Sequence, residues 1–307
     1  MTRPPVAPMP LRSILCAVDL AADATCALER AAWLARCHGA ELHVAHVVEG
    51  SAMEVLRQWL GAGSSVEQAL LERARNDLHA LLEPVRRAFG VQAHAMVLAG
   101  LVPDQVIGAA HRVGAELLVV GAGQGASALR HVVLGSTADR LLRRGHRPVL
   151  MARNAAMTDY ARALVAVDFS PWSAACLAWA RRVAPRAHLV LHHAWSVPFE
   201  EKLQFAGVDP ATVQAYEYAA QSDAQRRLHD LAAQEGLGAS DWTPSLVHGD
   251  ADLTMAKVAS DMDCDLIVVG KHGSHAAQDL LLGSVTRHVL GEAAQDVLVV
   301  TQPAAAA

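Results

Sequence analysis

The sequence has few aromatic residues, no block of basic charge and no long apolar run. Aromatic residues make up 4% of the 307 residues, so alanine, valine and leucine must supply most of any core. The formal net charge is −5, which argues against a nucleic-acid-binding protein because such proteins usually carry a clustered basic surface. No stretch of about 18 apolar residues occurs, so we expect no transmembrane helix.

Cysteine usage points to a reducing compartment. The number of cysteines is odd, none forms a CxxC pair, and three lie in or beside apolar runs, where a reduced thiol behaves as a small hydrophobic group. They are Cys16, Cys26, Cys37, Cys176 and Cys264. The first ten residues hold four prolines and no apolar run of signal-peptide length. We therefore expect a cytoplasmic protein without disulfides and without a membrane partner.

The sequence contains an internal repeat. Residues 14–19 (ILCAVD) return as residues 163–168 (ALVAVD), 149 positions later, and residues 117–121 (LLVVG) return as residues 266–270 (LIVVG), also 149 later. Residues 134–136 (LGS) return as residues 282–284, 148 positions later. Such constant spacing indicates duplication of a whole domain. The sequence therefore predicts two domains, residues 1–153 and 154–307.

Each copy alternates short apolar runs with longer helical patterns. The apolar runs predict strands near 13–18, 41–48, 92–97, 116–120 and 148–152, and then near 163–167, 188–194, 243–247, 265–269 and 296–300. Helical stretches include 25–37, 66–88 and 102–113; in the second, one predicted face carries Val66, Leu70, Ala74, Leu78, Leu81 and Val85. This alternation predicts an α/β fold, with two tandem doubly wound domains, each a five-stranded parallel sheet with helices on both faces.

Two loops in the second copy lie where open parallel sheets bind ligands, beyond the carboxyl ends of the strands. Asp168 follows the first strand, although an aspartate there is also a common cap of a helix or turn. Gly270 and Gly273 follow the fourth strand, and Gly283-Ser284 begins a helical pattern nine residues later. Glycines let the backbone approach a phosphate, and the free amides of a helix N-terminus bind anions.

These residues carry a resemblance to a known family. The pattern Gly, two residues, Gly, nine residues, Gly, then Ser or Thr is the nucleotide-binding pattern of the universal stress proteins, and Gly270, Gly273, Gly283 and Ser284 match it completely. The first-strand Val-Asp and the second-strand residues (His46-Val47 and His193-Ala194) recur in the same order in both copies. The chain thus resembles a tandem-domain universal stress protein over nearly its whole length.

The resemblance implies an adenine nucleotide, ATP or ADP with or without Mg, in a groove between the first and fourth strands. Its implied nucleotide-binding positions are Ala166, Asp168, Ala194, Val269, Gly270, His272, Gly273, Gly283, Ser284, Val285 and Thr286. The matching positions of the first copy are Ala17, Asp19, Val47, Val120, Gly121, Gln124, Gly125, Gly135 and Ser136. The first copy departs from the pattern, because three residues separate Gly121 from Gly125 and Ala138 replaces Thr286.

The function implied is a nucleotide-binding stress-response protein, a sensor or adaptor with little or no turnover and at most a slow ATPase activity. The alternative is an interaction or chaperone-like stress protein that needs no nucleotide. In this family single domains commonly pair through their last strands, so we expect strands near 149–152 and 297–300 to make that pair within one chain, with association into a homodimer left open.

Other chemistries fit the sequence less well. No Walker A string occurs, and the glycine loops follow the fourth strand, whereas a dinucleotide fingerprint follows the first. His192 and His193 are adjacent on a predicted strand and so point to opposite faces, which argues against a shared metal. Cys264 lies between Asp263 and Asp265, whose charges would raise the pKa of its thiol. We therefore expect neither a metal site nor a nucleophilic catalyst.

Overall fold

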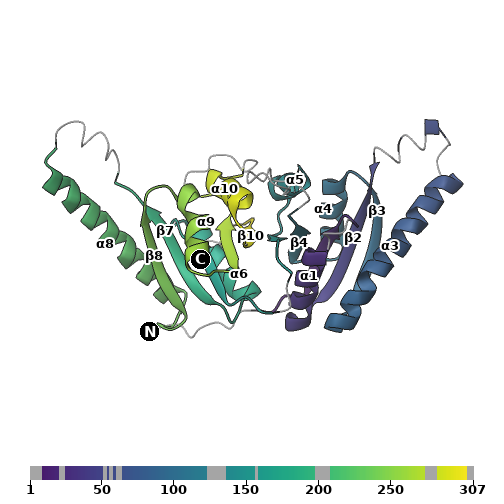
Figure 1. Ribbon diagram of the computed structural model, residues 1–307, viewed down its shortest axis with the longest axis horizontal. Coiled ribbons are helices and arrows are strands. Elements are labelled where there is room, and N and C mark those ends of the chain that lie inside the picture. Colours follow the sequence, from purple (N-terminus) through teal and green to yellow (C-terminus); the bar gives the residue numbers. More distant parts are fainter. Residues whose placement is uncertain are drawn as a thin grey trace. The chain divides into compact units, whose positions relative to one another are not determined.

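The computed structural model describes residues 9–20, 25–50, 54, 58–59, 64–122, 136–155, 158–197, 208–273 and 282–302. The chain divides into two compact units, each of strands alternating with helices (Figure 1). The first unit consists of residues 9–159 together with residues 296–301, and the second unit contains residues 160–295. Each repeat of the sequence thus builds a unit, but the last strand of the second repeat belongs to the first unit.

The sheet of the first unit has five parallel strands and one antiparallel strand. The parallel strands are β1 (Ser13–Val18), β2 (Glu41–Glu49), β3 (Ala93–Gly100), β4 (Leu117–Gly121) and β5 (Val149–Ala152), in the order β3-β2-β1-β4-β5. Strand β10 (Asp296–Val300) runs antiparallel to β5, with Leu298 opposite Leu150. The predicted pairing of the two last strands within one chain is therefore confirmed.

Helices cover this sheet in two pairs. Helix α1 (Thr25–His38) packs against α3 (Ser65–Phe89), and α4 (Val102–Arg112) packs against α5 (Ser136–Arg144). The Ser64 side chain caps the start of α3 by accepting from the Glu67 amide, and Gly90, with φ 67°, ends it. The two helix pairs explain why β1 and β4 are buried almost throughout.

The buried face of α3 differs in part from the predicted one. Its buried apolar residues are Ala74, Leu78, Leu82, Val85 and Phe89. Val66 is exposed, and Leu82 takes the place predicted for Leu81 because steps of four, four and three residues from Ala74 follow one stripe of a helix. The predicted face was therefore right at Ala74, Leu78 and Val85 and wrong at Val66, while Leu70 and Leu81 are only half-buried.

The second unit repeats the parallel arrangement. Its strands are β6 (Arg162–Ala166), β7 (His188–Trp195), β8 (Trp242–His248) and β9 (Leu266–Gly270), in the order β9-β6-β7-β8. Helix α6 (Pro171–Val183) packs on β6 and β9, and α8 (Pro210–Gln234) packs on β7 and β8. Helices α9 (Ala251–Asp261) and α10 (Ser284–Glu292) pack against each other. The predicted α/β fold of two tandem repeats is confirmed.

None of the helices in the described part of the chain is both long and apolar enough to cross a membrane.

Candidate functional site

The carboxyl end of β6 leads into a turn organised around Asp168. Its Oδ1 accepts hydrogen bonds from the amide of Ser170 at 3.0 Å, from the Ser170 hydroxyl at 2.6 Å and from the Ser173 hydroxyl at 2.9 Å. Ser173 Oγ in turn accepts from the Asp168 amide at 3.0 Å, and Ser170 caps α6 by accepting from Trp172 N. Asp168 thus organises the turn, in keeping with the common role of aspartate at such places. It also presents a fixed carboxylate at the edge of the sheet.

An aromatic stack closes the neighbouring side of this turn. Phe169 has the left-handed φ of 61°, which directs its ring against His193 at 4.4 Å between centroids. The Arg227 guanidinium, from α8, lies 4.0 Å from the centroid of the Phe169 ring. His193 Nδ1 lies 2.7 Å from the Val167 carbonyl oxygen, so this nitrogen carries the proton of the bond. The stack joins β6, β7 and α8 beside Asp168.

At Gly270, the last residue of β9, a side chain would not fit without a shift of the backbone, and at Gly273 it would be tight. A Cβ on Gly270 would lie 2.8 Å from the His272 carbonyl oxygen and 3.1 Å from Trp172 Cε3. A Cβ on Gly273 would lie 3.2 Å from Asp168 Oδ2, so the loop after β9 passes directly beside the carboxylate at the end of β6. The two loops singled out in the sequence therefore meet at one edge of the sheet.

The start of α10 is joined to the same loop by two hydrogen bonds. The Gly283 amide donates to the Lys271 carbonyl at 3.0 Å, and Thr286 Oγ1 donates to the Gly270 carbonyl at 2.6 Å. Gly283 is the N-cap residue of α10 and Ser284 its first helical residue, as the sequence predicted. The amides of the first turn of a helix have no intrahelical acceptor and therefore point to whatever lies before the helix.

Positive and titratable groups of this loop are largely buried. Lys271 is 5% exposed and His272 is 9% exposed, and the His272 ring meets the Trp172 ring edge-on at 5.4 Å. Ser284, by contrast, is exposed at the helix start. Lys271 and the N-terminus of α10 therefore lie at the same edge of the sheet as the Asp168 carboxylate.

The remaining implied positions lie on the same strands and helix. Ala166 is the last residue of β6, Ala194 lies one residue before the end of β7, Val269 is the penultimate residue of β9, and Val285 is in the first turn of α10. Residues 274–281, between the second and third glycines of the pattern, lie outside the described residues. Hydrogen bonds and close approaches thus bring Asp168, Gly270, Gly273, Gly283 and Thr286 together, with Ser284 beside them.

The first repeat keeps part of this geometry. His46 Nδ1 lies 3.0 Å from the Val18 carbonyl, as His193 does from Val167, and Leu20 has a φ of 58°, close to that of Phe169. Asp19 is exposed, however, and the positions of Ser170 and Ser173 are taken by Ala21 and Ala24 in the sequence. Among the described residues, a Cβ on Gly121 would come no closer than 3.9 Å to its nearest neighbour, Ala27 Cβ, so these residues do not require glycine there.

Other implied positions of the first repeat are only partly described. Gln124, Gly125 and Gly135 lie outside the described residues, and of Ser136 only its place as the first residue of α5 is described. Ala17 and Val47 lie on β1 and β2, and Val120 lies on β4 next to Gly121.

Two histidines and three thiols near the sheet have shifted pKa values. Burial, followed by the neighbouring charge of His193, lowers the pKa of His192 to about 4. Burial lowers the pKa of His193 as well, with Arg227 adding to it and the Val167 hydrogen bond opposing it. Burial raises the pKa of Cys16 to about 12 and raises that of Cys176 further.

For Cys264 the pKa is raised, as the sequence predicted, but burial contributes more than the charges of Asp263 and Asp265. Within the described ranges, no three His, Cys, Asp or Glu side chains converge in a way that could hold a metal ion.

With the glycine loops and the helix start at one sheet edge, the family can be assigned. The pattern of the Universal stress protein family matches residues 10–153 and again residues 159–301. The chain belongs to this family. Its two matches follow the two repeats of the sequence and together cover nearly all of it.

Relatives agree with this assignment. A universal stress protein of Methanocaldococcus jannaschii is 27% identical over 120 residues, which are 39% of this chain and 69% of that protein. Universal stress protein A homolog 2 of Coxiella burnetii is 36% identical over 78 residues, 25% of this chain and 51% of that protein, so the match spans about half of that relative.

Solved structures share the fold over both repeats. The crystal structure of a universal stress protein from Archaeoglobus fulgidus has a TM-score of 0.64 at 19% identity, covering 94% of this chain and 97% of that one. A protein of unknown function from Pseudomonas aeruginosa has a TM-score of 0.62 at 21% identity, covering 94% and 92% of the two chains.

Three side chains of the site were not singled out from the sequence. Ser173 follows Asp168 by five residues, which places a hydroxyl on the first turn of the next helix and could have indicated its bond to the carboxylate. Trp172 comes close to Gly270 through the tertiary fold, and no local pattern marks it. Arg227 comes from a helix 58 residues beyond Phe169, and no local pattern marks it.

Proposed function

We propose that this universal stress protein binds an adenine nucleotide, ATP or ADP with or without Mg, at the carboxyl ends of β6 and β9. The observation that carries the proposal is the join between the glycine loop and α10, made by Gly283 N to Lys271 O and Thr286 Oγ1 to Gly270 O. These bonds hold the first-turn amides of α10 beside a loop in which Gly270 leaves no room for a side chain and Gly273 leaves little. A polyphosphate is the ligand that such a cradle suits.

Different residues of the chain would contact the phosphates, the ribose and the adenine. The amides of Gly283, Ser284 and Val285 and the exposed Ser284 hydroxyl would receive the phosphates. Asp168 Oδ2, which lies toward Gly273, would receive the ribose hydroxyls, while Ser170 and Ser173 hold the other carboxylate oxygen in place. Ala166 and Ala194, at the ends of β6 and β7, would border the adenine.

We propose binding with little or no turnover, in the role of a cytoplasmic sensor or adaptor. Asp168 Oδ1 already accepts three hydrogen bonds, which supports a positioning role for this carboxylate over that of a general base. The second repeat, residues 154–307, is the principal site in this proposal. The first repeat, residues 1–153, lacks the serine pair beside its aspartate and has an altered glycine spacing.

The alternative is a stress protein that acts through protein contacts and needs no nucleotide. The longer spacing between Gly121 and Gly125 favours it for the first repeat. The amount of nucleotide bound to the purified protein distinguishes the two functions. The full chain is denatured, and the nucleotide in the supernatant is measured by anion exchange. We expect about one adenine nucleotide per chain and a higher melting temperature when ATP is added, because a ligand that binds only the native state stabilises it.

Two matched glycine variants assign the site. The nearest described atom to a Cβ on Gly283 would be the Lys271 carbonyl oxygen at 3.4 Å, so Gly283→Val should fold while its side chain blocks the approach of phosphate. Gly135→Val makes the same change at the equivalent position of the first repeat. We expect the first variant to lose bound nucleotide and thermal shift and the second to keep both. Unchanged binding in Gly283→Val would refute the site, and absence of nucleotide in the wild type would favour the alternative.

A further inference from the structure

The contact between β5 and β10 is nearly symmetric. Leu150 and Leu298 occupy equivalent positions of the two repeats, 148 residues apart, and they also lie directly opposite each other. On either side of this centre, Met151 faces Val297 and Val149 faces Val299, and all of these residues are buried. Because both strands present nearly the same apolar surface, these side chains would allow β5 to pair equally well with β5 of a second copy of this chain.

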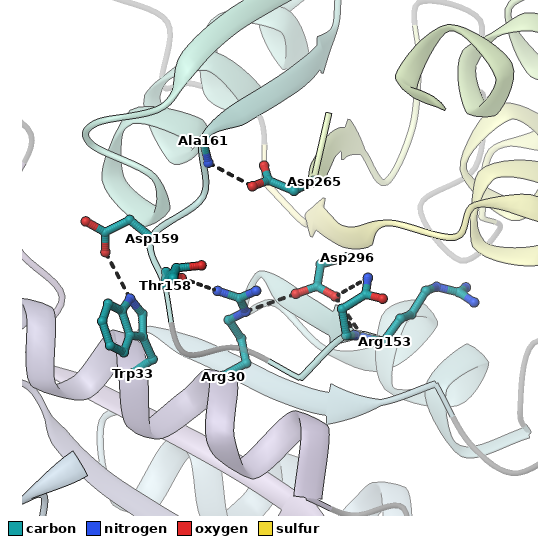
Figure 2. A network of polar contacts seen from close by, with 9 residues as sticks. Arg30, Trp33, Arg153, Thr158, Asp159, Ala161, Asp265 and Asp296 are labelled. Carbon is teal, nitrogen blue, oxygen red and sulfur yellow. Dashed lines mark hydrogen bonds and ion pairs between the residues drawn. The ribbon is translucent and has the colours of Figure 1, made fainter. Parts of the chain in front are cut away.

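A buried ion pair beside the strands breaks this symmetry. Arg30, on α1, donates from Nε to Asp296 Oδ2 at 3.0 Å, and the two side chains are 7% and 1% exposed (Figure 2). The same guanidinium donates from Nη1 to the Thr158 carbonyl. The other carboxylate oxygen of Asp296 accepts from the amides of Arg153 and Asn154, at 2.8 Å and 3.1 Å. Asp296, at the first position of β10, is thus bonded to a side chain and to two backbone amides of the first unit.

Neither member of the pair has a counterpart in the other repeat. The position equivalent to Arg30, 149 residues later, is Trp179, and the position equivalent to Asp296, 148 residues earlier, is Pro148. In a pairing of β5 with β5 of another copy, each Arg30 would face a proline in place of a carboxylate. In a pairing of β10 with β10, each Asp296 would face a tryptophan in place of a guanidinium. The first arrangement buries Arg30 without a carboxylate, and the second buries Asp296 without a guanidinium; burying a charge without its countercharge is strongly unfavourable.

We propose that Arg30 and Asp296 select the partner of β5, so that it pairs with the last strand of its own chain and not with β5 of a second copy. The apolar residues of the strands supply most of the buried surface. The ion pair makes β10 of the same chain a better partner for β5 than β5 of a second copy. The amides of Arg153 and Asn154 do not discriminate, because every residue at those positions would offer an amide unless it were proline.

A cysteine at the centre of the interface reports which strands pair. In a Cys37→Ser background, which removes the exposed native thiol, Leu150→Cys can form a disulfide between chains only if β5 meets β5. The pair Leu150→Cys with Leu298→Cys gives a disulfide within the chain if β5 meets β10. Each protein is refolded and oxidised at a series of protein concentrations up to about 0.5 mM. The highest of these approaches the millimolar effective concentration of a strand that is tethered in the same chain. Non-reducing gels then separate the products.

With the ion pair intact, we expect Leu150→Cys to give no more than a trace of linked dimer. Adding Arg30→Gln and Asp296→Asn should raise the dimer fraction at least about tenfold, a change of about 1.4 kcal/mol in preference. The control is Arg143→Gln with Asp139→Asn, which removes a half-exposed ion pair of the same unit and should leave the dimer fraction unchanged. Equal dimer fractions with and without the Arg30–Asp296 pair would overturn the proposal, as would abundant dimer while the pair is intact.

If the doubly substituted chain does not regain its circular dichroism spectrum, Asp296→Asn alone replaces it. This variant keeps an acceptor oxygen for the amides of Arg153 and Asn154 and removes only the charge. The same rise in linked dimer is expected from it, and an unchanged fraction contradicts the proposal in the same way.

Discussion

His192 and Ser245 face each other across β7 and β8, with His192 Nδ1 3.0 Å from Ser245 Oγ and both side chains buried. The other ring nitrogen of His192 has no hydrogen-bond partner among the described residues. A proton on this ring would therefore place a buried charge beside a hydroxyl alone, which agrees with the lowering of the His192 pKa to about 4.

This histidine predicts a pH dependence of stability. Between the pKa of the folded state, about 4, and that of the unfolded chain, about 6.5, the unfolded state binds more protons, so the free energy of unfolding falls as the pH falls. In urea titrations, the free energy of unfolding of the wild type should fall between pH 7 and pH 5. We expect this fall to be smaller by about 2 kcal/mol in His192→Gln. The exposed His146, changed to Gln, is the control, and a wild-type slope in His192→Gln would contradict the prediction.

The two repeats should respond differently to alanine at the first loop glycine. Gly270→Ala would bring a methyl group to 2.8 Å from a backbone oxygen, and we expect a loss of about 1–3 kcal/mol of stability from the forced shift. In Gly121→Ala the nearest described atom is a methyl carbon at 3.9 Å, and the change should cost less than about 1 kcal/mol. Chemical denaturation of both variants checks this, and equal losses would contradict it.

Ser173 should affect nucleotide affinity through Asp168. Ser173→Ala removes the 2.9 Å bond that holds the carboxylate, so we expect nucleotide affinity to fall about tenfold and stability to fall by about 1 kcal/mol. Ser240→Ala, which removes an exposed hydroxyl bonded to its neighbour Asp241, is the control and should change neither quantity. Isothermal titration with ATP measures the affinity. A stability loss with unchanged affinity would show that Ser173 serves the turn alone.

The Arg30–Asp296 pair should dominate the effect of single charge removals on stability. Arg30→Met leaves the Asp296 carboxylate buried without a guanidinium, and we expect a loss of about 3 kcal/mol or more. Arg143→Met breaks a half-exposed pair of similar length and should cost less than about 1 kcal/mol. Urea unfolding compares the two, and a loss of similar size in both would show that Asp296 is satisfied by backbone amides alone.

Much of the fold could be predicted because the apolar runs indicate both which strands are buried and that the domain is duplicated. Runs such as residues 117–120 (LLVV) and 266–269 (LIVV) are buried on both faces, and their recurrence 149 residues apart revealed the duplication. The glycine spacing marked the loop after β9, and the contact of Gly273 with Asp168 agrees with the expectation that both loops share one sheet edge.

Side chains that reach the site from elsewhere could not be predicted in the same way. Arg227 meets Phe169 because α8 packs on β7, which depends on the register of the helix on the sheet. Leu81 and Leu82 are neighbours with equal hydrophobicity, and only the position of α3 on the sheet decides which of them is buried. The Arg30–Asp296 pair joins residues 266 positions apart, and neither has an equivalent in the other repeat that could draw attention to it.

The place of β10 in the first unit also sets an order of events when the protein is made. The ribosome completes residues 9–159 and then must add residues 160–295 before the strand that covers β5 exists. Throughout that interval the nascent chain presents an uncovered apolar strand edge, together with an Arg30 whose carboxylate has not yet been synthesised. Residues 296–301 therefore complete the unit that was made first, and a premature stop before Asp296 leaves the edge of β5 uncovered.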